Sequence, residues 1–447
     1  MKLRLPHTFV LLLGLTLVAA ILTWFLPAGR YQRHEVEGRQ LVDPTSYSEV
    51  PARPAGLKEV AFAFPRGLVA TASIVFYIFL IGGAFGVLQA TGALEAGIDA
   101  IVRAAGRRDA LVIPSLMLLF SLGGATLGIA EETLPFLPGL VILARRLGYD
   151  EIVGGAIALV GAGAGFAGAF FNPFTVGVGQ AIAGLPLYSG LGFRLIVWAV
   201  LTAVSIAYVA RWARRHRLPA VPQEAAAAAR RIRWRHGAVL GAFGLALVLV
   251  AVGSLSWGWG LTELSGLFVL VAAVAGPLGG LTADATAESF LSGAAGLTSA
   301  ALVVGLARGV LVIFDGAQVT DSILHAMAGA VAGLPQGVSV AGIYAVQVGL
   351  SYLVPSGSGQ AALSLPILVP LGDLVGVTRQ TSVLAYQFGD GFSNIFTPTQ
   401  GYFMAGLALI GVPWTRWVRF LWPLQVIWLL VGLVFLLIAH ALRWGPF

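Results

Sequence analysis

Three carboxylates stand in stretches of sequence that are otherwise apolar enough to cross a membrane. Glu131 and Glu132 follow a glycine-rich stretch without an adjacent Arg or Lys, and Asp390 precedes Asn394 by four residues, about one helical turn. An ionised side chain at the bilayer centre costs roughly 2.5–3.5 kcal/mol on insertion scales, so such a group is usually paired, protonated or functional. Three carboxylates near one cavity favour a cationic group, sodium or protons as ligands. In a helix Glu131 and Glu132 would point about 100° apart, so we expect only one to face the cavity.

Neutral polar residues and prolines interrupt the same apolar background once in each half of the chain. Proline lacks a backbone N–H and its ring clashes with the preceding turn, so each position should break a helix. Backbone groups freed at membrane depth are tolerated only where protein or water satisfies them, and a matched pair of breaks points to a transporter's binding site. The candidate binding residues at the breaks are Asn172, Pro173 and Thr175 in the first half and Asn394, Thr397 and Thr399 in the second.

A second polar group lies in the segment Pro355–Gln360, of sequence PSGSGQ, between two apolar arms. Ser and Gln supply hydrogen-bond donors and acceptors without the desolvation cost of a charge. We therefore add Ser356, Ser358 and Gln360 to the candidate binding residues. The alternative, here and at the two breaks, is that these side chains only satisfy their own interrupted backbone.

One basic residue, Arg308, lies in the middle of a predicted helix. It is a candidate to bind the carboxylate of a substrate, and equally a candidate structural partner for one of the three acids. Asp315, Asp373 and Arg379 lie nearer the predicted helix ends, where we expect them to be interfacial.

The sequence offers few residues for disulfide, metal or catalytic chemistry. The chain contains no cysteine, which excludes disulfides, thiolate chemistry and Cys-ligated metals. No HExxH motif occurs, so we expect no metal centre, a Na⁺ site near the hairpin tips excepted, and no cofactor. An intramembrane enzyme would need a base for Ser358. His325 is the candidate within a predicted helix, and nothing in the sequence pairs the two, so we predict no catalytic residues.

The composition is that of a polytopic membrane protein. Of 447 residues 58% are hydrophobic and 11% charged, against roughly 25% charged in a soluble domain. Apolar runs such as Val10–Phe25, Gly237–Val252 and Val418–Ala439 approach or meet the roughly 20 residues needed to span a bilayer. We expect an all-α, multi-pass protein of the cell (inner, cytoplasmic) membrane, in contact with the lipid bilayer.

The net charge of +7 does not indicate nucleic-acid binding, because the basic residues crowd a loop between predicted helices. Basic loops face the cytoplasm, so this loop and the N-terminus, with Lys2 and Arg4, are placed inside. The first helix, about 8–26, is read as retained, with a cleaved signal peptide as the alternative. Counting the predicted membrane crossings from the cytoplasmic N-terminus then places the C-terminus outside. The basic residues of the loop are Arg211, Arg214, Arg215, Arg217, Arg230, Arg231, Arg233 and Arg235.

Charge and parity also place the elements of the first half. Arginines flank two half-length apolar arms, which indicates a re-entrant hairpin entering from the cytoplasm. The following helix is broken at Asn172-Pro173 and crosses outward. The predicted elements are a polar outside segment (27–66), a helix (68–90), the two arms (109–122 and 132–146) joined by Gly123–Gly128, the broken helix (151–182) and a returning helix (192–212).

The second half repeats this pattern at an offset of about 225–228 residues. Pro398 follows Pro173 by 225 positions, and Pro366 follows Pro138 by 228. Two helices (237–254 and 263–281) precede the second repeat against one in the first, so the repeats should be inverted and the second hairpin should enter from outside. The expected divisions are 1–66 (first helix and outside segment), 67–215 (first inverted repeat), 216–236 (basic cytoplasmic linker), 237–293 (scaffold helices) and 294–447 (second inverted repeat).

Six motifs are spread over the chain: Pro6–Thr8 (PHT), Trp24–Gly29 (WFLPAG), Ala130–Phe136 (AEETLPF), Asn172–Gly177 (NPFTVG), Pro355–Gln360 (PSGSGQ) and Gly389–Asn394 (GDGFSN). In these motifs essentially the whole chain resembles YfcC-type carriers, which sit with the anaerobic four-carbon-dicarboxylate carriers in the ion transporter superfamily. The resemblance implies an inverted-repeat fold with re-entrant hairpins, often a homodimer, and an elevator-like motion. Some similar members exchange arginine for ornithine.

The sequence therefore predicts a secondary active transporter for a small carboxylate-bearing metabolite. A basic amino acid fits best, because the acids would meet its cationic groups and Arg308 or helix N-termini its carboxylate. A four-carbon dicarboxylate is the close alternative, with the acids then serving Na⁺ or H⁺ as coupling ions. A channel is a remote alternative, because paired hairpins suit a gated site better than a continuous pore.

Overall fold

The computed structural model describes residues 8–36, 39–97, 100, 109–217, 233–257 and 259–445. The described part is mostly helical, with strands confined to one segment near the N-terminus. Motif residues Pro6 and His7 and most of the predicted linker 216–236 lie outside the described residues.

The N-terminal segment begins with α1 (Thr8–Leu22), and two small antiparallel sheets follow it. β1 (Gly29–Arg30) pairs with β4 (Ser48–Glu49), and β2 (Arg33–Val36) pairs with β3 (Arg39–Val42). α3 (Ala72–Ala90) lies within the helix predicted over 68–90, and α2 (Leu57–Ala70) is a further helix that falls mostly in the polar outside segment predicted over 27–66. α2 begins at Leu57, where the Glu59 carboxylate accepts the Gly56 N–H at 2.9 Å and so satisfies one of the free donors at the helix start.

The next elements carry the first candidate site residues. The predicted link Gly123–Gly128 is helical through Leu127. Within this helix, Gly124 lies so close to the backbone of Ala162 and Phe166 that a Cβ would have no room. Non-helical chain is confined to residues 128–130. The elements are α5 (Asp109–Leu127), the 3₁₀ helix η2 (Glu131–Phe136), α6 (Leu137–Arg146), α7 (Glu151–Ala167), the π-turn η3 (Pro173–Gly177), α8 (Val178–Ile182) and α9 (Leu191–Arg215).

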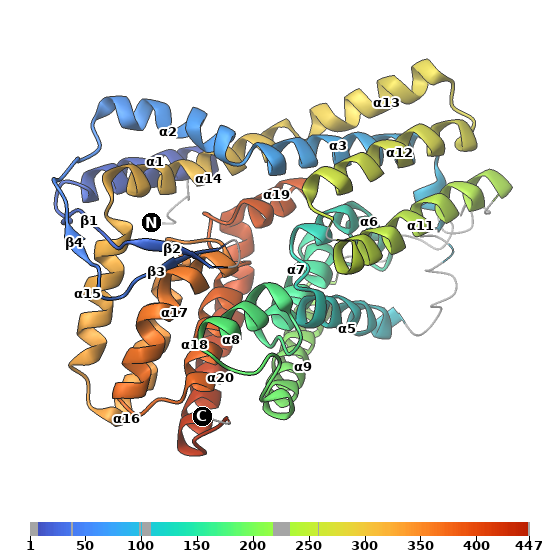
Figure 1. Cartoon of the computed structure of the whole chain (residues 1–447). Helices are drawn as coiled ribbons and strands as arrows, with labels where there is room; N and C mark the ends of the chain where they lie inside the picture. Colours follow the sequence, from blue (N-terminus) through green and yellow to red (C-terminus); the bar gives the residue numbers. More distant parts are fainter. Residues whose placement is uncertain are drawn as a thin grey trace.

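In the described residues of the second half, all regular elements are helices. Its elements are α11 (Trp234–Ser256), α12 (Leu261–Gly279), α13 (Ala283–Gly296), α14 (Thr298–Ala317), α15 (Thr320–Ala332), α16 (Gln336–Ser351), α17 (Gly357–Leu374), α18 (Arg379–Ser393), α19 (Gly401–Leu409) and α20 (Trp414–Ala441). In Figure 1, α2, α3, α12 and α13 run along the upper edge, and α15–α18 and α20 lie below them.

Glycines join α2 and α3 to α13 and α14. α3 packs against α13 and α2 against α14, so the two helix pairs run antiparallel. A Cβ on Gly86 would lie 2.9 Å from the Gly293 Cα, and one on Gly67 would lie 2.9 Å from the Gly309 N. Small residues at such crossings let helix backbones approach closely, as membrane helices commonly do.

Two sets of polar contacts tie helix ends together at separate places. At one, Arg416 at the start of α20 contacts Asp150 and Glu151 at the start of α7, and Arg145 at the end of α6 lies 3.8 Å from Glu151. At the other, the Thr378 hydroxyl before α18 donates to the Trp444 carbonyl after α20 at 2.9 Å. α20 therefore runs from the first set of contacts to the second, whereas α7 begins at the first and α18 at the second.

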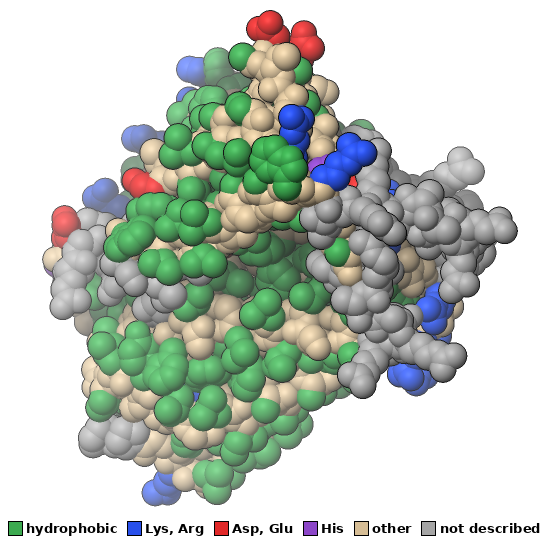
Figure 2. Space-filling model, turned by 90° about the vertical axis from the view of Figure 1, so that its right-hand side faces the viewer, with side chains coloured by type: hydrophobic (Ala, Val, Ile, Leu, Met, Phe, Trp, Pro, Cys, Tyr) green, Lys and Arg blue, Asp and Glu red, His purple; other side chains and the backbone are tan. Residues whose placement is uncertain are grey.

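The surface is that of a membrane protein. Within the described residues, five helical segments are long and apolar enough to cross a membrane. Figure 2 shows hydrophobic side chains spread over the face that it presents, with few charged side chains in its middle. Large apolar side chains are exposed on α1 and α20, among them Leu17, Ile21, Leu430 and Val434.

Candidate functional site

In the first half, residues 168–172 form a non-helical interruption between α7 and η3. α7 ends at Ala167, and helical backbone resumes at Pro173, where the fully buried Asn172 caps η3 by accepting the Phe174 N–H at 2.9 Å. The N–H groups of Phe170 and Phe171 donate to the Ala125 carbonyl of α5 at 3.2 and 3.1 Å. The neighbouring helix thus satisfies donors freed by the interruption. The Asn172 amide nitrogen is buried without a hydrogen-bond partner in the described structure.

The link between α5 and η2 lies against this interruption. Gly128 has φ +67°, and a Cβ there would lie 2.7 Å from both Asn172 side-chain polar atoms. Glu131 and Glu132 follow in the first turn of η2. One Glu132 carboxylate oxygen accepts the Ala130 N–H at 3.0 Å and so caps the start of η2. The Glu131 carboxylate does not bond to Ala130; its backbone hydrogen bond is to its own N–H.

In the second half, residues 394–400 form a non-helical interruption between α18 and α19. Freed carbonyls are satisfied by indoles of α20, since Trp414 donates to the Phe396 carbonyl at 2.9 Å and Trp417 to that of Ile395 at 3.0 Å. Asn394 hydrogen-bonds to the Asp390 carboxylate and accepts from the Gln400 amide. The hydroxyl groups of Thr397 and Thr399 bond to each other at 2.8 Å, and that of Thr399 also donates to the Tyr352 carbonyl at 3.3 Å. Both hydroxyl groups therefore already have hydrogen-bond partners within the protein.

The start of α17 lies between the two halves. A Cβ on Gly357 would lie 2.7 Å from the Asp390 Oδ2 and 2.7 Å from the Thr175 Cγ2. The Tyr386 hydroxyl donates to the Gly357 carbonyl at 2.7 Å. Asp390 Oδ2 and the Thr175 hydroxyl are buried without hydrogen-bond partners in the described structure. One residue at this helix start therefore brings together a carboxylate and a hydroxyl from opposite halves.

The other polar residues of this segment point elsewhere. Ser356 caps α17, and Ser356 and Ser358 are exposed. Gln360 is fully buried, but its amide donates to the carbonyl and side-chain oxygens of Gln347 at 2.9 and 2.8 Å. The structure thus groups Thr175 with Asp390 and separates Ser358 and Gln360 from them.

Tyr402 of α19, which the sequence did not single out, links the acids of the two halves. Its buried side chain interacts electrostatically with Glu131, Glu132 and Asp390. One turn further along α19, a Cβ on Gly406 would lie 3.0 Å from a Leu137 methyl group, so α19 packs directly on the start of α6. On the other side, Tyr77 of α3 interacts with Glu131 and Glu132, and its buried hydroxyl has no partner in the described structure.

α7 and α18 cross one another just before their interruptions. The Gln387 amide donates to the Phe166 carbonyl at 2.6 Å, and Gly391 packs on Ala167, where a Cβ would lie 2.8 Å from the Ala167 Cβ. This crossing places the two interruptions side by side. Residues far apart in the sequence thereby become neighbours, since Phe166 and Gln387 are separated by 221 positions.

Arg308 is not paired with the three acids. It lies in α14 beside Gly305 and Gly309, and its Nε is buried without a hydrogen-bond partner in the described structure. Its electrostatic neighbour is Asp315, two turns along the same helix. The described residues contain no ion pair between Arg308 and Glu131, Glu132 or Asp390, so the structural alternative for Arg308 finds no support there.

The sequence also missed Arg194, because it stands close to the predicted start of its helix. Arg194 is fully buried, donates to the Gln380 side-chain oxygen at 3.5 Å and lies 5.4 Å from the Trp444 ring. Gln180 donates to the same oxygen at 3.3 Å, so this cluster ties α8, α9 and α18 together near the end of α20.

Within the described residues, no group of three or more His, Cys, Asp or Glu side chains is placed to hold a metal ion.

Comparisons with known proteins identify the family. The family model described as DcuC, C4-dicarboxylate anaerobic carrier, matches residues 5–441. YfcC of Escherichia coli (strain K12), provisionally named a basic amino acid antiporter, is 34% identical over 466 residues, covering 93% of this chain and 92% of that protein. An uncharacterised protein of Haemophilus influenzae is 27% identical over 497 residues, covering 98% and 97%.

Two solved transporter structures are also similar over the whole chain. The YdaH transporter of Alcanivorax borkumensis has a TM-score of 0.44 at 18% identity, covering 99% of this chain and 100% of that one. MtrF of Neisseria gonorrhoeae has a TM-score of 0.43 at 16% identity, covering 98% and 95%. By the family model and the identity to YfcC, the chain belongs to the C4-dicarboxylate anaerobic carrier family, as a YfcC-type carrier.

Proposed function

We propose that this protein is a secondary active transporter that exchanges a basic amino acid across the cytoplasmic membrane by alternating access. Three carboxylates carry the proposal: Glu131, Glu132 and Asp390 all act electrostatically on the buried Tyr402. Within the described residues none of the three forms an ion pair with Lys or Arg. Carboxylates in an apolar interior attract cations strongly because little water screens them, and a guanidinium or ammonium group would supply the cation.

The carboxylate of such a substrate would be held by backbone N–H groups. α17 begins at Gly357, beside Asp390 and Thr175, and the free N–H groups of a helix start carry a partial positive charge. The unpartnered amide nitrogen of Asn172 is a further donor near the same place. A zwitterion with a cationic side chain therefore finds complementary groups for both of its ends.

Alternating access draws support from the order and direction of the helices. α7, η3–α8 and α9 are followed in the second half by α18, α19 and α20 in the same order. α7 begins beside Arg416, whereas α18 begins beside Trp444 at the other end of α20. We propose that the two sets are inverted repeats and that the α5–α6 and α16–α17 hairpins are re-entrant from opposite sides. An elevator-like motion of these elements is part of the same proposal.

A four-carbon dicarboxylate is the second candidate substrate, and the description of the matching family favours it. Arg308, whose Nε has no partner in the described structure, would then bind one substrate carboxylate. Glu131, Glu132 and Asp390 would bind Na⁺ or H⁺ as coupling ions. The two candidates differ in whether the acids face the substrate or the coupling ion.

Exchange in proteoliposomes separates the two candidates. Vesicles loaded with arginine, ornithine or succinate would be mixed with labelled arginine or succinate outside. We expect saturable arginine uptake that internal ornithine accelerates and internal succinate does not. Exchange of succinate alone would overturn the amino-acid proposal and favour the dicarboxylate. Conductance far above carrier rates, without counterflow, would indicate a channel instead.

A further inference from the structure

A polar cavity of about 750 Å³ lies between the strand segment and the junction of α14 with α15. Its lining includes Arg30, Arg33, Ser48, Asp315 and Asp321. A second cavity of about 400 Å³ shares Arg33 and Asp315 with it and extends to Ser358 in the first turn of α17. The two cavities thus adjoin one another, and the lining residues of neither include Glu131, Glu132 or Asp390.

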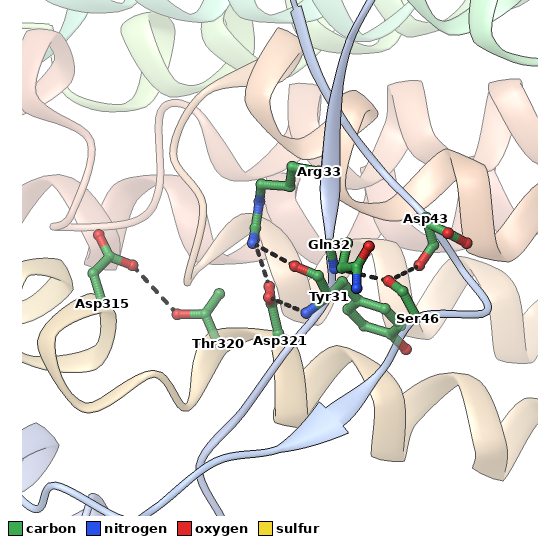
Figure 3. Close-up of polar contacts among 8 residues, drawn as sticks. All are labelled: Tyr31, Gln32, Arg33, Asp43, Ser46, Asp315, Thr320 and Asp321. Carbon is green, nitrogen blue, oxygen red and sulfur yellow. Dashed lines mark hydrogen bonds and ion pairs between the residues drawn. The ribbon is translucent and has the colours of Figure 1, made fainter.

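Arg33 and Asp321 neutralise one another in this cavity, as Figure 3 shows. The Arg33 Nη2 lies 2.7 Å from the Asp321 Oδ1, and the Tyr31 N–H donates to the Asp321 Oδ2 at 2.9 Å. Asp321 is buried, with 5% of its surface exposed. Both of its carboxylate oxygens are therefore occupied by groups that hold the strand segment against α15.

Asp315 is left without such a partner. Its carboxylate is exposed and accepts a hydrogen bond from the Thr320 hydroxyl at 3.4 Å (Figure 3). It forms no ion pair within the described residues, although Arg33 and Arg308 act on it from a distance. Arg30 lines the same cavity. The lining of this cavity therefore contains a carboxylate and a guanidinium, the two kinds of group that the two ends of a zwitterion require.

We infer that this outer cavity is a second, weaker binding site for the transported amino acid, in which Asp315 binds the cationic group and Arg30 the carboxylate. The site is weaker than the inner one because Asp315 and Arg30 are exposed residues, whereas Asp390 of the inner site is buried. This inference rests on the proposed function, since it gives both sites the same substrate. A dicarboxylate would be repelled by Asp315 and is expected to bind there poorly.

The absence of cysteine in the sequence allows a direct test with a single reporter. In purified full-length protein, Ser48→Cys places a thiol in the cavity lining, and its modification by a maleimide is followed with and without arginine. At an arginine concentration of roughly ten times Kd we expect modification to slow by about tenfold, because the free fraction of sites falls in that proportion. Succinate at the same concentration should have little effect.

Three variants in the Ser48→Cys background identify the binding group. Asp315→Asn should abolish the protection by arginine. Glu49→Gln, an acid beside the reporter that does not line the cavity, should retain it, and so should Glu131→Gln, which alters only the inner site. Protection that survives Asp315→Asn but disappears in Glu131→Gln would overturn the inference, because the signal would then come from the inner site.

The transport assay keeps this test separate from that of the proposed function. Arginine exchange without any protection of Ser48→Cys would overturn the outer site and leave the proposed function intact. Protection that depends on Asp315, in a protein that does not exchange arginine or ornithine, would support arginine binding in the cavity and overturn the proposed function.

Discussion

Glu131 and Glu132 are adjacent but do not have the same environment. In a 3₁₀ helix, with three residues per turn, successive side chains point about 120° apart. Glu132 caps the start of η2 through the Ala130 N–H, so part of its role is structural. The backbone bond of the Glu131 carboxylate is to its own N–H and caps no neighbouring residue, and both carboxylates interact with Tyr402. Of the two, Glu131 is therefore the better candidate to bind the cationic group of a substrate.

Charge-neutralising substitutions should separate the two glutamates. We expect Glu131→Gln to lower kcat/KM for arginine exchange by roughly 10- to 100-fold, corresponding to about 1.5–3 kcal/mol for a hydrogen bond to a charged group. Glu132→Gln keeps an oxygen that can accept the Ala130 N–H and should lose less activity. Exchange rates in proteoliposomes at matched protein density provide the measurement. Full activity in both variants would contradict the assignment of the site.

The limits of sequence reasoning are clear at this scale. Glu131, Glu132 and Asp390 stood out because a carboxylate in an apolar run is energetically costly. Tyr402 did not, because a tyrosine in an apolar helix looks like any core aromatic residue. Its place beside the glutamates depends on the packing of α19 on the start of α6, which the sequence does not show.

At the scale of elements, glycines allow the α5–η2 link and the start of α17 to pack closely against residues at the interruptions. Gly128 lies against Asn172 in a backbone conformation that side chains disfavour, and Gly357 lies against Asp390 and Thr175. The prolines of the two interruptions could be recognised in the sequence because proline cannot continue a helix. The roles of these glycines could not, because a glycine in sequence does not show which backbone approaches it. For the same reason, Gly124 was expected in a link and lies in a helix.

Alanine substitutions test this packing. We expect Gly357→Ala to lower the exchange rate by about tenfold or more, because overpacking typically costs 1–3 kcal/mol and here would displace Asp390. Gly128→Ala should do the same through Asn172. Gly139→Ala is the matched control: a Cβ there meets nothing within 4 Å, and alanine should stabilise the helix by about 0.5–1 kcal/mol. Exchange rates and melting temperatures of the three purified variants give the comparison. Normal exchange in Gly357→Ala would show that this contact does not shape the site.

At the scale of the whole molecule, contacts between helix ends define two separate regions. Arg145, Glu151 and Arg416 meet at one, and Arg379 pairs with Asp373 at 2.9 Å and donates to the Ala183 carbonyl at 3.0 Å at the other. The sequence predicts that the first region is cytoplasmic and the second outside, from the placement of arginines in loops. Parity could supply this orientation, but it could not supply the crossing of α7 with α18, which depends on contacts between distant residues.

Single cysteines in this cysteine-free chain test the orientation directly. Asp373→Cys and Arg145→Cys each remove one member of an ion pair between partly exposed side chains, and such pairs contribute little to stability, so both variants should fold. We expect a membrane-impermeant maleimide to label Asp373→Cys in intact cells and Arg145→Cys only after permeabilisation. Labelling of both in intact cells would contradict the proposal that the two hairpins enter from opposite sides. The reverse pattern would keep the inverted repeats and overturn the placement of the N-terminus in the cytoplasm, because both regions would then have exchanged sides together.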